Sequence, residues 1–104
     1  MKILGFNRVE LLLPAEEIDA AVAKFNDTFG FQLAPPHRVE GQPVLSSTDC
    51  AAGIELIAPG VEASPLTSRL AEKGRGGIGP LVWEVDDIDA AREHLLRKGC
   101  RIYY

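Results

Sequence analysis

Ile18-Asp19-Ala20-Ala21 returns, seventy residues later, as Ile88-Asp89-Ala90-Ala91. Each copy follows a strand-like apolar run and opens a stretch whose apolar residues recur at helical spacing before a glycine. Identity over four residues that are common in helices can arise by chance, but here the flanking patterns agree as well. A repeat at a fixed offset indicates that one structural unit occurs twice. We therefore expect two strand–helix units in this chain.

The flanks of the first copy predict a strand, a helix and a set of short strands. Residues 3–13 are rich in Ile, Leu, Val and Phe, which predicts a strand that ends at Pro14, because proline has no N–H to donate to a sheet. Residues 16–29 predict a helix with one apolar face and with Gly30 as its C-terminal cap. Four short strands are expected beyond it, at residues 31–33, 37–40, 44–47 and 53–58. Their short connections favour an antiparallel meander.

The second copy has similar flanks. Ser64-Pro65 predicts a short helix to residue 73, with serine as the N-cap and proline in the first turn. Residues 78–85 predict a strand, residues 87–98 a helix with acidic residues in its first turn, and residues 101–104 the start of another strand. This mixture of elements predicts an α+β fold, with residues 1–104 as a single domain.

The overall composition excludes several classes of function. The chain has 104 residues, of which 46% are hydrophobic and 25% charged, as in an ordinary globular domain. Its formal net charge of −4 argues against a basic surface for nucleic acid, so no nucleic-acid partner is expected. No stretch predicts a membrane span or a signal peptide, so we expect a cytoplasmic protein. The two cysteines, Cys50 and Cys100, form no metal-binding motif and are expected to be buried.

Several segments, in order, resemble those of the vicinal-oxygen-chelate superfamily, which includes glyoxalases, bleomycin-resistance proteins and dioxygenases. These segments are Thr28-Phe29-Gly30-Phe31, Ile54-Glu55-Leu56-Ile57-Ala58-Pro59, Ser64-Pro65 and the run from Gly77 to Asp89. Within the superfamily the chain is most similar to methylmalonyl-CoA epimerase. The resemblance implies two βαβββ modules whose mixed sheet curls around a cleft. It assigns residues 1–60 to the first module, 61–77 to a connecting segment with a short helix, and 78–104 to the start of an incomplete second module.

The resemblance also implies a metal site built from four cleft side chains, two from each module. The first ligand, a histidine in the relatives, falls on Glu10, the second, a glutamate or glutamine, on Glu55, and the third, again a histidine, on Pro80. The fourth lies beyond Tyr104. Glu10 and Pro80 are separated by the same seventy residues as the repeat, in agreement with this assignment. With only Glu10 and Glu55 as ligands, a divalent Mg²⁺, Mn²⁺ or Ca²⁺ ion is favoured over Zn²⁺, and a metal-free site is the alternative.

Alternation along the strands sorts the side chains into two groups. Those expected to face the cleft are Arg8, Glu10, Leu12, Gly53, Glu55, Ile57, Pro80, Val82 and Glu84. Those expected to face the core are Val9, Leu11, Leu13, Leu81, Trp83 and Val85. The predicted cleft therefore holds three carboxylates and one guanidinium among apolar neighbours.

Two carboxylates in a partly apolar cleft can perform acid–base chemistry. If Glu10 and Glu55 approach each other, repulsion and desolvation raise the pKa of one of them, which leaves an acid beside a base. Because the relatives remove the proton next to a carbonyl, the first hypothesis is an isomerase or lyase for a small acyl substrate such as an acyl-CoA. In it, Glu10 and Glu55 are catalytic or metal-binding residues. The alternative for Glu10 is an ion pair with Arg8 or another cation, without chemistry.

Further residues are candidates for binding the substrate. Arg8 could hold a carboxylate or phosphate through paired hydrogen bonds, or simply neutralise a nearby glutamate. Glu84 lies on the predicted cleft face, and Arg75, in a glycine-rich turn, could meet a CoA phosphate. The second hypothesis is a non-catalytic protein that sequesters a small molecule, as bleomycin-resistance proteins do. Both hypotheses predict a homodimer, because a half-finished second module leaves open sheet edges.

Overall fold

The computed structural model describes residues 1–60, 64–74 and 76–102, and it confirms the α+β fold. The elements, in chain order, are β1 (Ile3–Leu12), the 3₁₀ helix η1 (Ala15–Glu17), α1 (Ile18–Phe29), β2 (His37–Arg38), β3 (Val44–Asp49), β4 (Ile54–Pro59), α2 (Pro65–Lys73), β5 (Gly77–Val85) and α3 (Ile88–Arg97). Both copies of the repeat begin a helix, α1 in the first case and α3 in the second. None of the helices in these ranges has the length and apolar character that crossing a bilayer requires.

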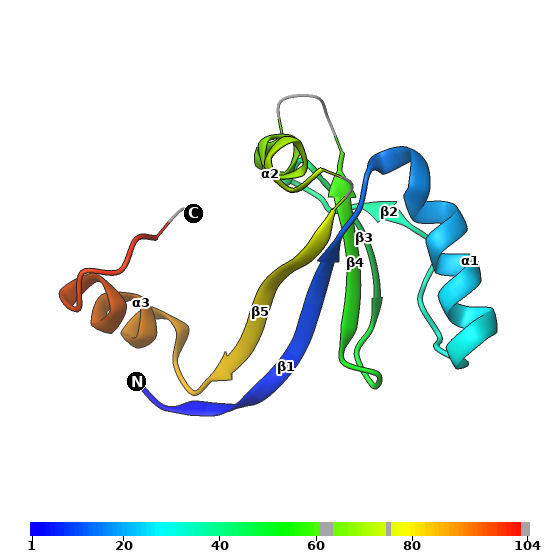
Figure 1. Ribbon diagram of the computed structural model, residues 1–104. Coiled ribbons are helices and arrows are strands. Elements are labelled where there is room, and N and C mark those ends of the chain that lie inside the picture. The colour runs from blue at the N-terminus through cyan, green and yellow to red at the C-terminus, as the bar shows by residue number, and fades with distance from the viewer. Residues whose placement is uncertain (61–63, 75, 103–104) are drawn as a thin grey trace.

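The five strands form one mixed sheet in the order β2-β3-β4-β1-β5 (Figure 1). The β2–β3, β3–β4 and β1–β5 pairs are antiparallel, whereas β1 and β4 are parallel. The predicted antiparallel meander is therefore present, and its last strand returns to pair with β1. β5 lies at one edge of the sheet and pairs with β1. The first strand of the second unit therefore lies beside the first strand of the first unit (Figure 1).

The main core lies between α1 and one face of the sheet. Its buried residues are Ile18, Val22, Leu33, Ile54, Leu56 and Ala58, and the partly buried Leu11 and Leu13 pack against them. The even-numbered apolar residues of β4 and the odd-numbered ones of β1 thus face the helix, as alternation predicts. In consequence, the opposite side chains of both strands lie on the other face of the sheet.

A second, smaller core fixes α2 on that other face. Leu12 and Ile57 are buried there together with Leu66 of α2, and Leu70 packs against them. The helix begins where the sequence predicts, because the Ser64 hydroxyl accepts a hydrogen bond of 3.2 Å from the Leu66 N–H. This core places α2 next to the strand positions that carry the predicted site.

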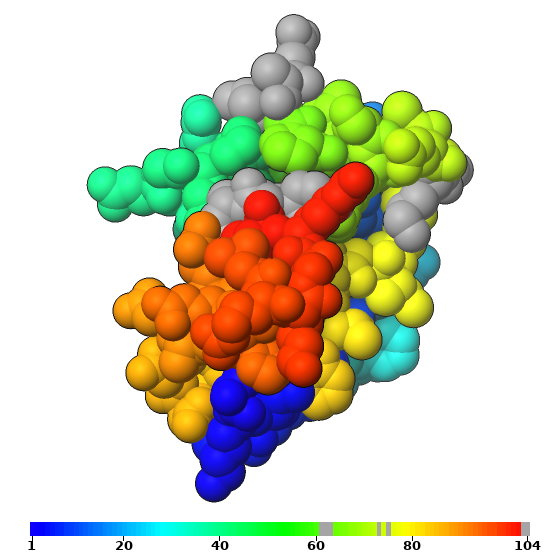
Figure 2. Space-filling model, turned by 90° about the vertical axis from the view of Figure 1, so that its left-hand side faces the viewer, coloured from blue at the N-terminus to red at the C-terminus, as the bar shows by residue number. Residues whose placement is uncertain are grey.

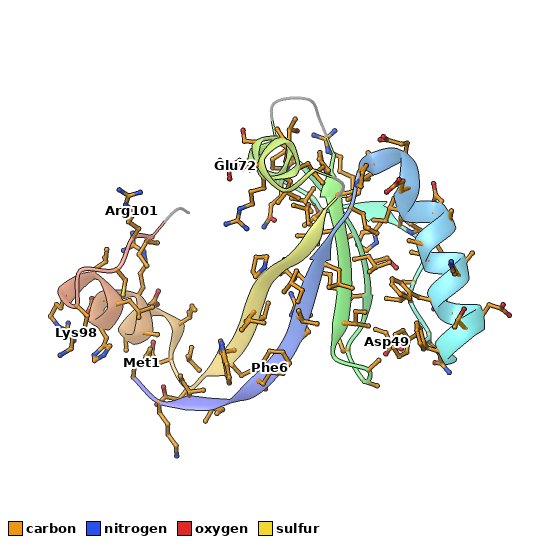
Figure 3. The ribbon with its side chains drawn as sticks, viewed as in Figure 1. Met1, Phe6, Asp49, Glu72, Lys98 and Arg101 are labelled. Atoms are coloured by element: carbon orange, nitrogen blue, oxygen red, sulfur yellow. The ribbon has the colours of Figure 1, made fainter. Side chains whose placement is uncertain are left out.

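The segment predicted as a strand at residues 31–33 is not one. Asn26 explains the difference, because its side chain takes the place of a neighbouring strand: its Nδ2 donates to the Leu33 carbonyl at 3.1 Å and its Oδ1 accepts from the Leu33 N–H at 2.9 Å. Asp49, labelled in Figure 3, ties the same loop to the β3–β4 hairpin by accepting from the Gln32 N–H at 2.7 Å. The loop therefore satisfies its polar backbone through side chains.

The ends of the predicted elements also need correction. The helix expected from residue 16 starts as the 3₁₀ turn η1, which lacks a side-chain cap, and becomes an α-helix only at Ile18. Arg101 and Ile102 form no strand, and the rest of the strand predicted at residues 101–104 falls outside the described residues. Cys50 and Cys100 were expected to be buried, but both are exposed, because Cys50 lies in the turn after β3 and Cys100 follows the turn at the end of α3.

The second unit is more open than the first. Leu81 and Trp83, predicted to face the core, are 56% and 51% exposed, and Val85 is half-buried. In the described part of the chain no strand covers the free edge of β5, and a cavity of about 450 Å³ separates Trp83 and Val85 from Ala91 and Leu95 of α3. Figure 2 shows α3 and the residues after it, in orange and red, directly above the blue first residues of the chain and beside the yellow residues of β5. The core prediction for β5 is thus wrong for a single chain.

Candidate functional site

The predicted site lies on the sheet face opposite α1. In the parallel register of β1 and β4, Glu10 is the partner of Glu55, so the two carboxylates stand side by side on adjacent strands. Arg8 and Leu12 flank Glu10 on the same face, and Ile57 flanks Glu55. Sequence alternation thus gave the correct face for the residues of β1 and β4.

Arg8 pairs with Glu55 rather than with Glu10. The Arg8 Nε lies 2.6 Å from Glu55 Oε1, and the other carboxylate oxygen, Oε2, accepts a hydrogen bond of 2.5 Å from the Ser46 hydroxyl. Glu55 is 8% exposed, so this carboxylate is removed from water and both of its oxygens have partners. The hydrogen bond to Glu55 also raises the pKa of Arg8. Arg8 and Glu55 form a fixed, hydrogen-bonded ion pair.

Glu10, in contrast, has no such partner. Burial raises the pKa of the Glu10 carboxyl, and the adjacent negative charge of Glu55 raises it further, although Arg8 and Arg69 oppose both effects. No hydrogen bond or ion pair involves its side chain in the described part of the chain. The two neighbouring carboxylates therefore differ: Glu55 is held by a cation, whereas the pKa of Glu10 is raised by its burial and by the charge of Glu55.

β5 brings the third position of the family's ligand set close to Glu10. The strand is irregular between the pairs Val9–Leu81 and Leu11–Ile78. A Cβ atom on Gly79, in this irregular stretch, would lie 3.0 Å from the Glu10 carbonyl oxygen and 3.8 Å from its Cβ. Pro80 follows directly and is exposed. Proline offers no side-chain ligand at this place.

Of the two remaining candidates, the structure places Glu84 away from the site. Glu84 is exposed and pairs with Gly5, towards the other end of β5, and no hydrogen bond or ion pair joins it to Arg8, Glu10 or Glu55 in the described residues. Arg75 lies outside the described residues. The predicted group of four charged residues is thus reduced to Arg8, Glu10 and Glu55.

Sequence reasoning missed two residues of the site, Ser46 and Arg69. Ser46 is the cross-strand partner of Ile57 and is 4% exposed, so its hydroxyl reaches Glu55 from β3. Arg69 belongs to α2, and its charge acts on Glu10. The alternation of the meander contained a signal for Ser46, whereas only the packing of α2 on Leu12 and Ile57 shows where Arg69 lies.

The residues present do not fit the metal site that the resemblance implies. Two adjacent carboxylates are compatible with a divalent ion, but Glu55 already has Arg8 and Ser46 on its two oxygens. Pro80 supplies no donor, and the described ranges contain no group of three or more His, Cys, Asp or Glu side chains that could hold an ion. A divalent ion at Glu55 would lie beside the Arg8 guanidinium, whose positive charge opposes its binding.

The site is an open face of the sheet rather than an enclosed pocket. The cavity beside α3 and a second one of about 580 Å³, between α2 and the chain around Pro14 to Glu16, both lie away from Arg8, Glu10 and Glu55. A ligand at this face would therefore have one side open unless another surface covers it.

Comparison with solved structures identifies the fold of the molecule. No family model matches the chain. Methylmalonyl-CoA epimerase from Mycobacterium tuberculosis superposes with a TM-score of 0.80 and 25% identity, over 98% of this chain and 69% of that one. A Streptomyces coelicolor methylmalonyl-CoA epimerase variant in complex with 2-nitronate-propionyl-CoA gives a TM-score of 0.81 at 23% identity, over 99% and 77% of the two chains. The molecule has the vicinal-oxygen-chelate fold.

Sequence comparison then gives the family. The ethylmalonyl-CoA/methylmalonyl-CoA epimerase of Cereibacter sphaeroides is 34% identical over 98 residues, which span 92% of this chain and 72% of that protein. The chain therefore belongs to the methylmalonyl-CoA epimerase family, as the sequence resemblance predicts.

Proposed function

We propose that this chain binds an acyl-CoA thioester on the open face of its sheet and moves the proton on the carbon next to the thioester carbonyl, with Glu10 as the acid–base residue. The observation that carries the proposal is the unequal state of two adjacent carboxylates. Glu55 is neutralised by Arg8, while Glu10 is partly buried and has no hydrogen-bond partner in the described residues. The family relatives, which are epimerases of acyl-CoA substrates by name, support the same choice of substrate class.

The chemistry follows from the properties of Glu10. In its ionised form the carboxylate accepts the proton as the C–H bond breaks, and the electron pair of that bond passes into the enolate of the thioester. Glu10 then carries the proton and can return it to the same face, and delivery of a proton from water to the opposite, open face of the planar enolate yields the epimer. A raised pKa makes the carboxylate a stronger base for this transfer.

Substrate binding is proposed to involve Arg8. Its guanidinium lies on the same strand face as Glu10 and suits a carboxylate or enolate oxygen. Arg69 on α2 adds a second positive charge whose effect reaches Glu10. The binding roles of Glu84 and Arg75, and a role for Glu55 beyond holding Arg8, stay predictions.

We also propose that a second copy of the chain covers the open part of the sheet. β5 is an edge strand, and the apolar side chains of Phe6, Ile78, Leu81 and Trp83 on β1 and β5 are at least half exposed. Phe6 and Trp83 already form an edge-to-face pair, with 5.2 Å between ring centroids, on this uncovered surface. A homodimer would bury it. The cytoplasmic location stays a prediction, and the two exposed free cysteines suit a reducing compartment.

Solvent deuterium exchange tests the proposed reaction. Methylmalonyl-CoA and ethylmalonyl-CoA in D₂O are followed by proton NMR, and wild type should exchange the α-proton faster than buffer alone. Glu10→Gln should lower the exchange rate by about 10²-fold or more, the usual contribution of a general base. Glu16→Gln, an exposed glutamate away from the site, is the matched control. Equal rates for Glu10→Gln and wild type would refute the assignment, and binding without any exchange would favour a sequestering protein.

A further inference from the structure

We infer that the guanidinium of Arg8 supplies the positive charge that a metal ion supplies in the fold family, so that this chain binds an enolate or carboxylate oxygen without a divalent ion. The inference rests on the proposed function for its choice of ligand. It concerns a different question, namely which group at the site stabilises negative charge.

The first support is the position of Arg8. Its side chain lies on the same face of β1 as Glu10, and its Nε is 2.6 Å from Oε1 of Glu55. Both Glu10 and Glu55 occupy positions at which the resemblance places metal ligands. A cation is therefore already bound to one member of that set, and it belongs to the chain itself.

The second support is the set of donors that Arg8 keeps free. Nε donates to Glu55 and Nη1 donates to Asn7 Oδ1 at 2.7 Å, and no other hydrogen bond of the guanidinium occurs within the described ranges. Its side chain is 28% exposed. An arginine has more N–H donors than these two contacts use, and a planar fork of donors matches the oxygens of a carboxylate or an enolate. Arg8 is held in place and can still bind a ligand.

The third support is the charge balance during proton transfer. Glu55 neutralises Arg8, and Glu10 is negative before it accepts the proton. Once Glu10 is protonated, Arg8 and Glu55 balance each other and the charge of Arg69 remains in excess. The site thus becomes more positive at the moment when the substrate becomes an enolate, which is the differential stabilisation that catalysis requires.

The fourth support is the poor prospect for a competing metal. Pro80 removes one donor, and Gly79 lies so close to the Glu10 backbone that a Cβ there would be 3.0 Å from its carbonyl oxygen. Both oxygens of Glu55 are occupied. A divalent ion would meet the positive charge of Arg8 at Glu55 and would gain few ligands.

Calorimetric titration with 2-nitronate-propionyl-CoA tests the inference, because a nitronate carries its negative charge on oxygen as an enolate does. Chelator-treated wild type should bind this probe, and added Mg²⁺ or Mn²⁺ should leave the affinity unchanged. Arg8→Met should weaken binding at least tenfold, Arg8→Lys less, and Arg38→Met, an exposed arginine on β2, should have no effect.

The unpaired Glu55 left by Arg8→Met could impair folding. The double variant Arg8→Met/Glu55→Gln removes both charges, and thermal melts identify the folded variants. It should bind the probe as weakly as Arg8→Met.

Metal-dependent binding of the probe, or equal affinity of wild type and folded Arg8→Met or double variant, would overturn the inference. The same chelated samples separate it from the proposed function. α-Proton exchange that needs added metal would leave the proposed function standing and refute the role of Arg8. If the protein exchanges no proton but binds the nitronate without metal and through Arg8, the proposed function is refuted and the role of Arg8 stands.

Discussion

Glu10 and Glu55 are the same residue type at matched positions on neighbouring strands, yet their surroundings differ. Glu55 receives Arg8 and Ser46, whereas Glu10 receives neither. The difference arises because the guanidinium of Arg8 reaches across to β4 instead of along its own strand. Glu55 is therefore held by a cation and a hydroxyl, while burial and the charge of Glu55 raise the pKa of Glu10.

The raised pKa of Glu10 predicts how stability depends on pH. Because the pKa of Glu10 is raised above its ordinary value of 4.5, the folded state binds the Glu10 proton more tightly than the unfolded chain does. The stability that this proton contributes is fully present below about pH 4.5 and is lost as pH rises through the folded pKa. Glu10→Gln removes this dependence. Relative to wild type, the variant should gain stability from about pH 4.5 upward, measured by urea unfolding at a series of pH values. A constant difference across the series would show that the surroundings of Glu10 do not perturb it.

Loss of the Arg8–Glu55 ion pair is expected to lower the free energy of unfolding. Glu55→Gln should lower the free energy of unfolding by about 1–3 kcal/mol, because a charge-assisted hydrogen bond is lost in a mostly buried place. Ser46→Ala, which removes only the second hydrogen bond to Glu55, should cost about 1 kcal/mol. Chemical denaturation of both variants checks this order. A Glu55→Gln protein as stable as wild type would mean that the pair contributes nothing.

For single residues of the site, alternation along the strands is sufficient to predict that Arg8, Glu10 and Glu55 share a face. It does not predict which residues pair, because that depends on side-chain rotamers and on a neighbour, Ser46, that is distant in the sequence. The expected alternative to chemistry was an ion pair of Glu10 with Arg8 or another cation, and the structure shows Arg8 paired with Glu55 instead.

The segment just before β5 passes very close to the end of β1. Gly76 has a φ of +125°, and a Cβ built on it would lie only 2.1 Å from the Leu12 carbonyl oxygen. Only glycine fits there without displacing β1, which carries Arg8 and Glu10.

Gly76→Ala should therefore lower the free energy of unfolding by about 2 kcal/mol or more, since both the backbone conformation and the contact are unfavourable for alanine. Gly5→Ala is the matched control, because a Cβ at Gly5 meets no atom within 4 Å. Thermal and urea unfolding of the two variants give the comparison. Similar values for both would contradict the close approach of Gly76 and Leu12.

The start of α2 was predicted best, because Ser64 caps it through its side chain as the local sequence indicates. The helix predicted from residue 87 begins at Ile88, and Asp87 is its N-cap. The segment at residues 31–33 was predicted wrongly, because apolar residues suggested a strand while Asn26, a helix residue, bonds the backbone of Leu33. Short-range patterns do not contain such long-range side-chain contacts.

For the whole molecule, the two units differ in how fully they are packed. The first unit has three strands in addition to β1 and a helix with a buried face. In the described residues of the second unit, β5 has a single strand neighbour and α3 packs loosely beside it. Sequence analysis predicted, from the repeat, that a second strand and helix follow the first unit, and β5 and α3 are these elements. It could not predict that Leu81 and Trp83 are exposed, since alternation identifies a face but not what covers it.

The uncovered apolar surface predicts self-association. Wild type should sediment as a dimer in analytical ultracentrifugation at micromolar concentration, and Leu81→Lys should shift it towards monomer by placing a charge in the interface. Phe29→Lys, on a similarly exposed apolar residue at the end of α1, should leave the dimer intact. A monomeric wild type, or equal effects of both variants, would contradict the proposed dimer surface.

Glu10, beside the ion-paired Glu55, holds a proton more readily than an ordinary glutamate does. The most direct test is a pH titration of the ¹³C-labelled glutamate carboxyl groups by NMR, with Glu10 assigned by its absence in Glu10→Gln. We predict a Glu10 midpoint above the ordinary value of 4.5, lower in Glu55→Gln and higher in Arg8→Met. A midpoint at or below 4.5 that neither variant moves would contradict the account.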